Sequence, residues 1–464
     1  MKNKFKYMIG AGLIALTSTS LLACSEIEDG YNDIDSWPEV IDYMSKLQHP
    51  CMLHTEDDFQ FVKEKVSTGA SPWKSAYDHL CQSKHAQDNW KADPVEVLKR
   101  LNPDVWGDKY SDHSNYTNLM KDAASAYQLA LRWKISDESD KDKYARAGID
   151  ILNDWAKTCT GYLVGSDGKF VDPNENLIAI QIYQLANAAE ILRDYEGWTS
   201  SDFIKYKSWM VDVFYPFASS FLSTHEGNKC ALHYWLNWDL ANMTAILSIG
   251  ILTDDNFKIN EAIQYFKYGI GSGNIVNGVP FVHQDPDSEE LLGQCQESGR
   301  DQGHATLCVS LMGVFCQMAK NIGEDLFAYD NYRALSMCEY IAKYNYGTTE
   351  TGSASASWNL SNFKYDVSSL PYTTYENCEG GVWPSMSYEE HKSGNETRGS
   401  VRPAWELFYR YAIDHNRPAR YAKEWVELMR QNAGRGYSDG GAGDYGPNSG
   451  GYDQLGFGTL MFAK

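Results

Sequence analysis

Apolar residues recur at three- and four-residue intervals along most of the chain. Within 116–135, the residues Leu119, Ala123, Ala126 and Ala130 follow this spacing, which places them on one face of a helix. Strand-like alternation of apolar and polar residues is scarce, so we expect an all-α protein. Further helices are predicted at 141–157, 176–195, 202–224, 238–252, 259–269, 303–321, 329–344 and 402–415.

Many successive helices without a fixed sequence repeat are compatible with two architectures, an irregular bundle or a closed ring of helical hairpins. A ring leaves a central cleft. The Gly-rich stretch 434–456 contains Tyr437, Tyr445 and Tyr452, which favour a structured loop with tight turns over disorder. Such a loop is a candidate cover for the cleft.

The start of the chain has a pattern typical of an exported lipoprotein. Lysines precede an apolar stretch over residues 8–22, which is followed by Cys24. This stretch is short and ends in small residues, so it suits a signal peptide better than a transmembrane helix. We therefore expect a lipoprotein signal peptide at 1–23 and lipid on Cys24.

Residues 24–47 are polar and acidic, and we expect them to form a tether between the lipid anchor and a single domain at 48–464. The acidic tract after Cys24 resembles the surface-export signal of lipoproteins in the Bacteroidetes group. The expected location is therefore the outer membrane, at the cell surface, with its periplasmic face as the alternative.

Composition excludes some functions and complicates others. The chain has 41 Lys and Arg against 62 Asp and Glu, for a net charge of −21, which disfavours nucleic acid as a partner. An anionic sugar polymer would need a locally basic or amide-rich cleft. The 13% aromatic content suits stacking against sugar rings, although most aromatic residues serve the core. Ten cysteines without a CxxC motif indicate neither a zinc site nor a dense disulfide framework.

Two short segments concentrate polar residues where a plain core helix would not. The first, 233–242, contains His233 and Asn237, four residues apart and so on one face if both are helical. The second, 294–304, contains Arg300 and His304 at the same spacing and leads into an apolar helix.

These residue types suit β-elimination on a uronic acid. The reaction needs a group that neutralises the C6 carboxylate, a base for the C5 proton and an acid for the departing O4. Asn, Gln, Arg and His suit the first task, Tyr or His suits the other two, and neither a metal nor a cofactor is expected.

Structural roles compete with this interpretation for each residue. Asn237 and Asp239 are candidates for helix capping, and Arg300 for an ion pair with Glu297 or Asp301. A glycoside hydrolase would instead pair Glu297 with Asp301 or Asp239. Such carboxylate pairs are easy to find among 62 acidic residues, so that signal is weak.

The same segments resemble the alginate lyase superfamily and, within it, polysaccharide lyase family 38. The resemblance covers essentially the whole mature domain, and its longest unusual motif is QESGRDQGH. It implies an (α/α) toroid, an incomplete barrel of helical hairpins numbering about seven, and endolytic cleavage of alginate, particularly its mannuronate, or of β-glucuronan. The matching segments are HPCMLHTEDDF (49–59), AASAYQLALRWKIS (123–136), YWLNWDLANM (234–243), GQCQESGRDQGHATL (293–307) and GPNSGGYDQLGFGTL (446–460).

The resemblance also implies roles for particular residues. Related toroidal lyases use a Tyr/His pair with an Asn or Arg that neutralises the carboxylate, and Asn237, Arg300 and His304 match these types. Tyr375 is the preferred tyrosine, with Tyr234 and Tyr445 behind it.

His233 is a further catalytic candidate. Other toroidal alginate lyases show an Asn-His pair followed shortly by Tyr-Trp, whereas this chain has Leu232 before His233. The expected substrate-binding residues are Tyr234, Trp235, Trp238, Gln296, Glu297 and Tyr445, with Glu297 orienting Arg300.

The sequence therefore predicts a monomeric lyase of acidic polysaccharide that leaves 4,5-unsaturated uronate ends. The main non-enzyme alternative is a surface lipoprotein that binds glycans without cleaving them. Arg402, at a predicted helix start, is expected to be structural and to pair with Glu406 four residues later.

Overall fold

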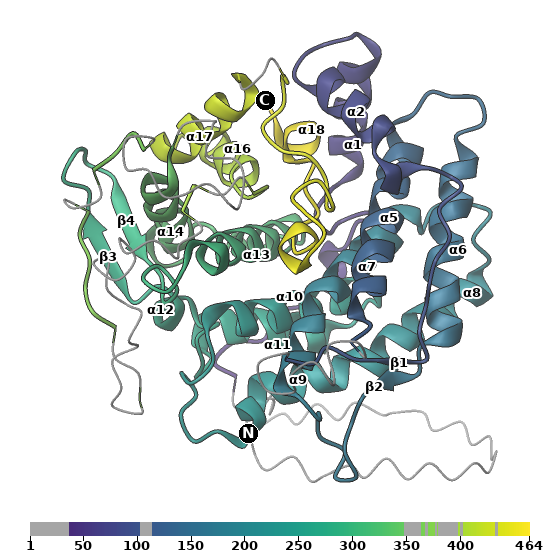
Figure 1. Cartoon of the computed structure of the whole chain (residues 1–464), viewed down its shortest axis with the longest axis horizontal. Coiled ribbons are helices and arrows are strands. Elements are labelled where there is room, and N and C mark those ends of the chain that lie inside the picture. The colour runs from purple at the N-terminus through teal and green to yellow at the C-terminus, as the bar shows by residue number, and fades with distance from the viewer. Residues whose placement is uncertain are drawn as a thin grey trace, which may run out of the picture.

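The computed structural model is almost entirely helical in the residues that it describes, and its helices form a ring (Figure 1). The signal peptide and Cys24 lie outside these residues. Among them, no helix is long and apolar enough to cross a membrane. The described residues are 37–102, 114–347, 363–366, 370–375, 378, 398–399, 402–431 and 435–464.

The helical elements follow the predicted segments closely. The helices are α1 (Glu56–Ser67), α2 (Trp73–Gln82), α5 (Tyr116–Ile135), α6 (Asp142–Thr158), α7 (Ala179–Leu192), α8 (Ser200–Trp209), α9 (Tyr215–Thr224), α10 (Leu236–Leu252), α11 (Asn256–Tyr268), α12 (Ile275–Gly278), α13 (Gln302–Asn321), α14 (Tyr329–Asn345), α16 (Glu406–Asp414), α17 (Arg420–Gln431) and α18 (Gly458–Phe462).

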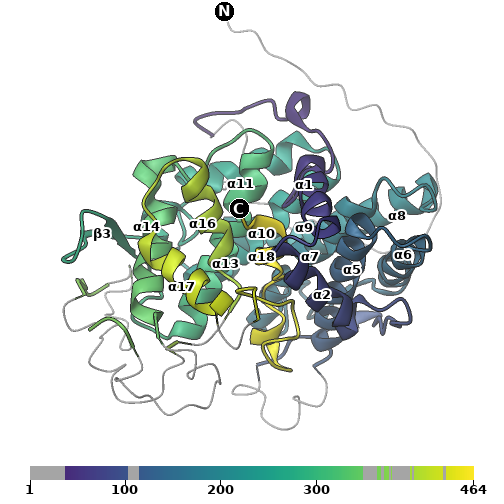
Figure 2. The same ribbon diagram turned by 90° about the horizontal axis from the view of Figure 1, so that it is seen from above.

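The described strands form two small sheets. Strand β1 (Val97–Leu98) pairs in parallel with β2 (Gly161–Tyr162). Strand β3 (Phe281–Gln284) pairs antiparallel with β4 (Leu291–Gln294) in a hairpin that was not predicted. This hairpin lies at the edge of the molecule with β4 against α14 (Figures 1 and 2).

The ring has inner and outer helices, as expected of an (α/α) toroid. Helices α5, α7, α10 and α13 contact one another in that order, α13 then contacts α16, and α16 contacts α18, which returns to α1 and α2. All 14 residues of α7 are buried, whereas α6 keeps a polar face exposed outside the ring. The all-α toroid is therefore confirmed, while the number of hairpins stays a prediction.

The predicted helix 202–224 is interrupted. A π-helical turn, Met210–Phe214, separates α8 from α9, and Pro216 follows in the first turn of α9. Proline has no N–H to donate to the preceding turn, so the regular α-helical hydrogen bonding cannot continue through this point.

The C-terminal segment closes the ring by bonding to inner helices. The side-chain amide of Gln128, on α5, donates to the Ala442 carbonyl at 3.1 Å, and that of Gln184, on α7, donates to the Tyr452 carbonyl at 2.9 Å. Both glutamines are buried, so these bonds satisfy polar groups that would otherwise be costly inside the ring. The Gly-rich stretch is thus an ordered loop where it is described, as predicted.

A buried carboxylate joins the last helices to this segment. Glu406 accepts two hydrogen bonds from Arg430 Nη2, at 2.9 and 2.8 Å, and further bonds from the Ser438 and Thr459 hydroxyls. The expected pair between Arg402 and Glu406 is therefore wrong. Arg430 takes that place because α17 packs beside α16, a long-range contact that local spacing does not encode.

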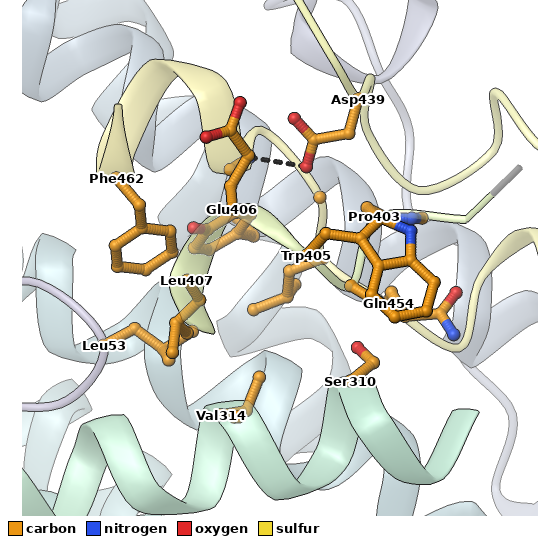
Figure 3. Close-up of a pocket in the computed structure, with 16 residues that line it drawn as sticks. Leu53, Ser310, Val314, Pro403, Trp405, Glu406, Leu407, Asp439, Gln454 and Phe462 are labelled. Atoms are coloured by element: carbon orange, nitrogen blue, oxygen red, sulfur yellow. Dashed lines mark hydrogen bonds between the residues drawn. The ribbon is translucent and has the colours of Figure 1, made fainter. Parts of the chain in front are cut away.

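A small cavity lies where α13, α16 and the C-terminal segment meet (Figure 3). Glu406 and Asp439 stand at one wall, opposite Ser310 and Val314 of α13. Its volume of about 40 Å³ is sufficient for a few water molecules. It is too small for a sugar ring, so a substrate site must be sought elsewhere on the ring.

The N-terminal part of the described chain packs against α11. Ile41 exchanges two hydrogen bonds with the Asn260 side chain, at 2.9 and 2.8 Å, and Tyr43 is fully buried. Trp37 packs on Phe257, with ring centroids 5.2 Å apart. The folded part therefore includes residues from Trp37 onward, which had been expected to belong to the tether.

His49 fixes the following segment to the ring. Its Nδ1 lies 2.6 Å from Glu190 of α7, and its Nε2 lies 2.8 Å from Asp254 in the turn after α10. Burial lowers the pKa of His49, but hydrogen bonds with Cys51 and Glu190 outweigh it and raise this pKa from 6.5 to about 10. His49 is thus a cation held between two carboxylates.

We expect Arg430→Ala to lower the free energy of unfolding by roughly 3 kcal/mol, because it leaves the buried Glu406 charge without its cation. Urea denaturation measures this. The control is Lys423→Ala on the same helix, whose exposed pair with Glu427 should contribute less than about 1 kcal/mol. Equal losses in both variants would contradict the role given to Glu406.

We expect the His49 cation to make stability depend on pH. A raised pKa stabilises the fold fully below about 6.5, and this contribution disappears as the pH rises through about 10. Compared with the wild type, His49→Gln should lower unfolding free energy on the order of 2–4 kcal/mol at pH 6 and much less at pH 10. Parallel curves for the two proteins across this range would refute the proposed charge.

Candidate functional site

The first polar cluster lies at the start of α10. The helix begins at Leu236, so His233 belongs to the preceding turn, where its N–H donates to the Cys230 carbonyl at 3.0 Å. The expectation that His233 and Asn237 share a helical face is therefore wrong. Asn237 lies in the first turn of α10 and is only 2% exposed.

The second cluster lies between β4 and α13. Helix α13 begins at Gln302 with Asp301 as its N-cap, so Arg300 lies outside the helix and does not share a helical face with His304. Asp301 links the two residues instead. Its Oδ1 accepts from the His304 N–H at 2.8 Å, its Oδ2 lies 2.6 Å from His304 Nδ1, and Arg300 Nε lies 3.6 Å from the same oxygen.

The charge of Asp301 is stabilised where it lies. Burial raises its pKa, but the hydrogen bond from the His304 ring, the electrostatic interaction with His304, the hydrogen bond from the His304 backbone N–H and the charge of Arg300 more than compensate, so the pKa falls to about 2. Asp301 is therefore ionised at neutral pH and fixes Nδ1 of His304 as a donor. Nε2 of His304 is therefore the ring nitrogen that can take part in proton transfer, and the side chain is 39% exposed.

Glu297 joins the two clusters. Its carboxylate accepts from the Asn237 backbone N–H at 3.1 Å and from Arg300 Nη1 at 3.0 Å, and it is completely buried. Arg300 in turn lies over the Trp235 ring, with its Cζ 4.4 Å from the centroid. The predicted orientation of Arg300 by Glu297 is present in the structure, and it brings both segments into one site.

Three buried polar groups at this site lack a hydrogen bond of normal geometry. They are the Asn237 Oδ1, both amide atoms of Gln296 and the hydroxyl of Tyr375. Buried polar atoms are usually paired, so such a group suggests a place for a ligand or water. Burial raises the pKa of Tyr375, and its interaction with Gln296 lowers it in part, which places the phenol beside that amide.

The segment that carries Tyr375 is held by side chains from two other elements. Gln294, at the end of β4, donates to the Thr373 carbonyl at 2.7 Å and accepts from the Thr373 N–H at 2.8 Å. The Tyr340 hydroxyl, on α14, donates to the Pro371 carbonyl at 2.8 Å. A disulfide between Cys230 and Cys378 ties the same segment to the turn that contains His233. Nothing in the sequence had indicated this pairing.

Arg402 and Asp453 extend the site toward the C-terminal loop. Burial raises the pKa of Asp453 to about 6, although the charges of Arg100, Arg402 and His304 lower it. Arg402 interacts with Asp453 and Asp301, while burial lowers its own pKa. Sequence reasoning missed both residues as members of the site, because they approach His304 only through ring closure.

The remaining aromatic candidates lie in packed positions. Tyr234 and Trp238 contact each other and Phe221, with ring centroids 5.0 to 6.1 Å apart. Burial raises the pKa of Tyr234 to about 12, and Glu226 adds to the shift. Tyr445 accepts the Gly440 N–H at 2.7 Å and so fixes a turn in the C-terminal segment.

The carboxylates proposed for hydrolysis are already engaged. Asp239 accepts from the Tyr265 hydroxyl at 2.9 Å and the Gly273 N–H at 2.8 Å, and it also contacts His225. Glu297 and Asp301 are committed to Arg300 and His304, as described above. A general acid and a base free to act on a glycosidic bond are therefore not found among these three groups.

One group of potential metal ligands occurs elsewhere in the described residues. Donor atoms of His49, Cys51 and Glu190 all lie within 4.8 Å of one another. Glu190 is already bonded to His49, to the Cys51 N–H and to Arg193 at 2.8 Å. These contacts explain the cluster as an ion-pair network that stabilises the fold.

Comparisons with known proteins place the chain in a family. The family model described as "Alginate lyase" matches residues 61–351. No curated protein sequence matches the chain.

Solved structures with similar folds include two alginate lyases. One from a Sphingomonas species is 13% identical, with 66% of this chain and 81% of that chain covered and a TM-score of 0.43. Another from Bacteroides ovatus is 15% identical, with 82% and 96% covered and a TM-score of 0.48. Since the family model matches well over half of the chain and spans both polar clusters, this protein belongs to the alginate lyase family.

Proposed function

We propose that this protein is a polysaccharide lyase that cleaves alginate, with a preference for mannuronate-rich regions, and that it belongs to polysaccharide lyase family 38. The observation that carries the proposal is the arrangement around Glu297. It joins the Arg300 cation to the start of α10, in one site where the Asn237 Oδ1 and the Gln296 amide lack a hydrogen bond of normal geometry and where Tyr375 interacts with Gln296.

Arg300 and the two amides are suited to bind the C6 carboxylate. Glu297 and the Trp235 ring hold the guanidinium in one orientation, so little reorganisation is needed when charge develops on the substrate. Asn237 also lies in the first turn of α10, where the helix dipole favours an anion. Neutralising the carboxylate makes the C5 proton acidic enough to be removed.

Tyr375, His304 and His233 are the proposed proton-transfer groups. Burial raises the pKa of Tyr375, so its phenol is protonated and carries the proton that O4 requires. Asp301 holds Nδ1 of His304 and leaves Nε2 available as a base. Elimination is syn if one tyrosine both removes the C5 proton and donates to O4, and anti if a histidine is the base.

The net charge of −21 does not preclude an anionic substrate. Arg100, Arg300 and Arg402 contribute positive charge around the site, whereas two of its acids, Glu297 and Asp301, are paired directly with Arg300 and His304. At physiological ionic strength, charges farther than about 8 Å are largely screened, so the local arrangement decides binding.

Glucuronan cleavage by the same mechanism is the second enzymatic candidate, because the carboxylate site does not distinguish the epimers by itself. The non-enzyme alternative is a protein that binds glycans without cleaving them.

We also propose that the protein is a lipoprotein at the outer membrane surface. The disulfide supports export, since such bonds persist mainly in oxidising compartments.

The reaction is tested by incubating the protein from residue 25 onward with polymannuronate, polyguluronate and glucuronan without added metal. We expect ultraviolet absorbance from unsaturated uronate to rise fastest with polymannuronate. A rise with glucuronan alone would assign the second substrate. Binding without any absorbance change would refute the lyase reaction in favour of glycan capture.

We expect Arg300→Ala to lower kcat/KM roughly 10²–10³-fold, because the carboxylate loses its fixed cation. Arg300→Lys should recover only part of this, since lysine lacks the planar guanidinium that Glu297 and Trp235 orient. The control is Arg417→Ala, which removes a similar contact with the Tyr332 ring, at 3.9 Å, outside the site. If both alanine variants stay within threefold of the wild type, Arg300 does not bind the substrate carboxylate.

A further inference from the structure

We infer that the Cys230–Cys378 disulfide and Gln294 are positioning elements that hold Tyr375 and His233 in register for proton transfer. This inference rests on the proposed lyase function. It assigns a catalytic purpose to a covalent bond and to a buried amide that the reaction itself does not require.

Each cysteine of the disulfide lies three residues along the chain from one of the two candidate groups. Cys230 lies three residues before His233, and Cys378 lies three residues after Tyr375. The cysteines are 148 residues apart in sequence and have Cα atoms 5.6 Å apart. The hydrogen bond from the His233 N–H to the Cys230 carbonyl carries the constraint directly into the histidine turn.

Gln294 holds the other side of Tyr375. Its amide makes both hydrogen bonds of the Thr373 backbone, two residues before Tyr375, so a side chain substitutes for a neighbouring strand. Gln294 is 1% exposed and also lies 3.1 Å from His283 on β3, which fixes the amide in turn. Tyr375 is therefore anchored on both sides, by Gln294 before it and by the disulfide after it.

Neither anchor can be replaced by local structure. Residues 370–375 form no helix or strand in the part of the chain that the structure describes, so their position depends on long-range bonds. A displacement of about 1 Å at a reacting group is enough to lower a rate roughly 10²-fold. Loss of either anchor should thus reduce turnover more than substrate binding.

The disulfide can be reduced selectively. Cys378 is exposed, whereas Cys230 is buried. A dithiol reductant can attack the exposed sulfur, giving two cysteine thiols and the oxidised cyclic disulfide of the reductant. The other described cysteines are free thiols, so reduction changes no second described bond.

The test compares the double variant Cys230→Ala/Cys378→Ala and the single variant Gln294→Ala with the wild type. Activity is measured on polymannuronate and on any other uronate polymer that the wild type cleaves. We expect kcat to fall 10- to 100-fold in each variant while KM changes less than threefold. The wild type treated with dithiothreitol should match the double variant, which dithiothreitol should not affect further. Cys81→Ser, a free cysteine outside the site, is the matched control and should keep full activity in either condition.

Hydrogen exchange measured by mass spectrometry supplies a readout that does not depend on activity. We expect faster exchange in peptides that cover 230–233 and 370–375 after reduction, with α7 and α10 unchanged. Unchanged kcat and unchanged exchange in the double variant would overturn the inference. If the wild type cleaves no polymer but these peptides still exchange faster after reduction, the proposed function fails and the catalytic purpose of the bond fails with it, although the bond still restrains both segments.

Discussion

The buried carboxylate of Glu297 is the interaction on which the site depends. Placing an ion in the interior is costly unless its oxygens are bonded, and here the two oxygens are satisfied from different elements. One bond comes from the start of α10 and the other from Arg300. The same group therefore fixes the distance between the two polar clusters and the direction of the guanidinium, so the fold and the chemistry share one constraint.

The ring imposes the second constraint. Its inner helices are largely buried, and α5 and α7 carry the polar residues Gln128 and Gln184 that must find partners inside. The C-terminal segment supplies those partners through backbone carbonyls. Because Asp453 lies on this segment, closing the ring also completes the rim of the site near His304. Stability and function are therefore coupled through the last residues of the chain.

The electrostatics of the site are local rather than global. Asp301 remains charged because His304 compensates it, whereas burial keeps the Tyr375 phenol protonated. A strongly acidic protein can in this way present a fixed cation and neutral donors to an anionic polymer. The surface charge provides solubility, whereas a few oriented groups provide recognition of the polymer.

The sequence by itself determined the helical class and most helix positions, since a buried face leaves a periodic pattern. Segment 116–135 corresponds to α5 at both ends, and α17 carries an equally clear pattern in Tyr421, Trp425 and Met429 that was overlooked. The motif QESGRDQGH also identified the segment that contains Arg300, Asp301 and His304. These features are local, because helix periodicity and capping depend on residues only a few positions apart.

Only the tertiary structure decided which groups meet. Four-residue spacing suggested that His233 and Asn237, or Arg300 and His304, share helical faces, but each helix begins between the two members of the pair. The structure instead joins Asn237 to Glu297, Cys230 to Cys378 and Glu406 to Arg430. Such contacts depend on how helices pack around the ring and on which buried charges need partners, and neither leaves a periodic trace in the sequence.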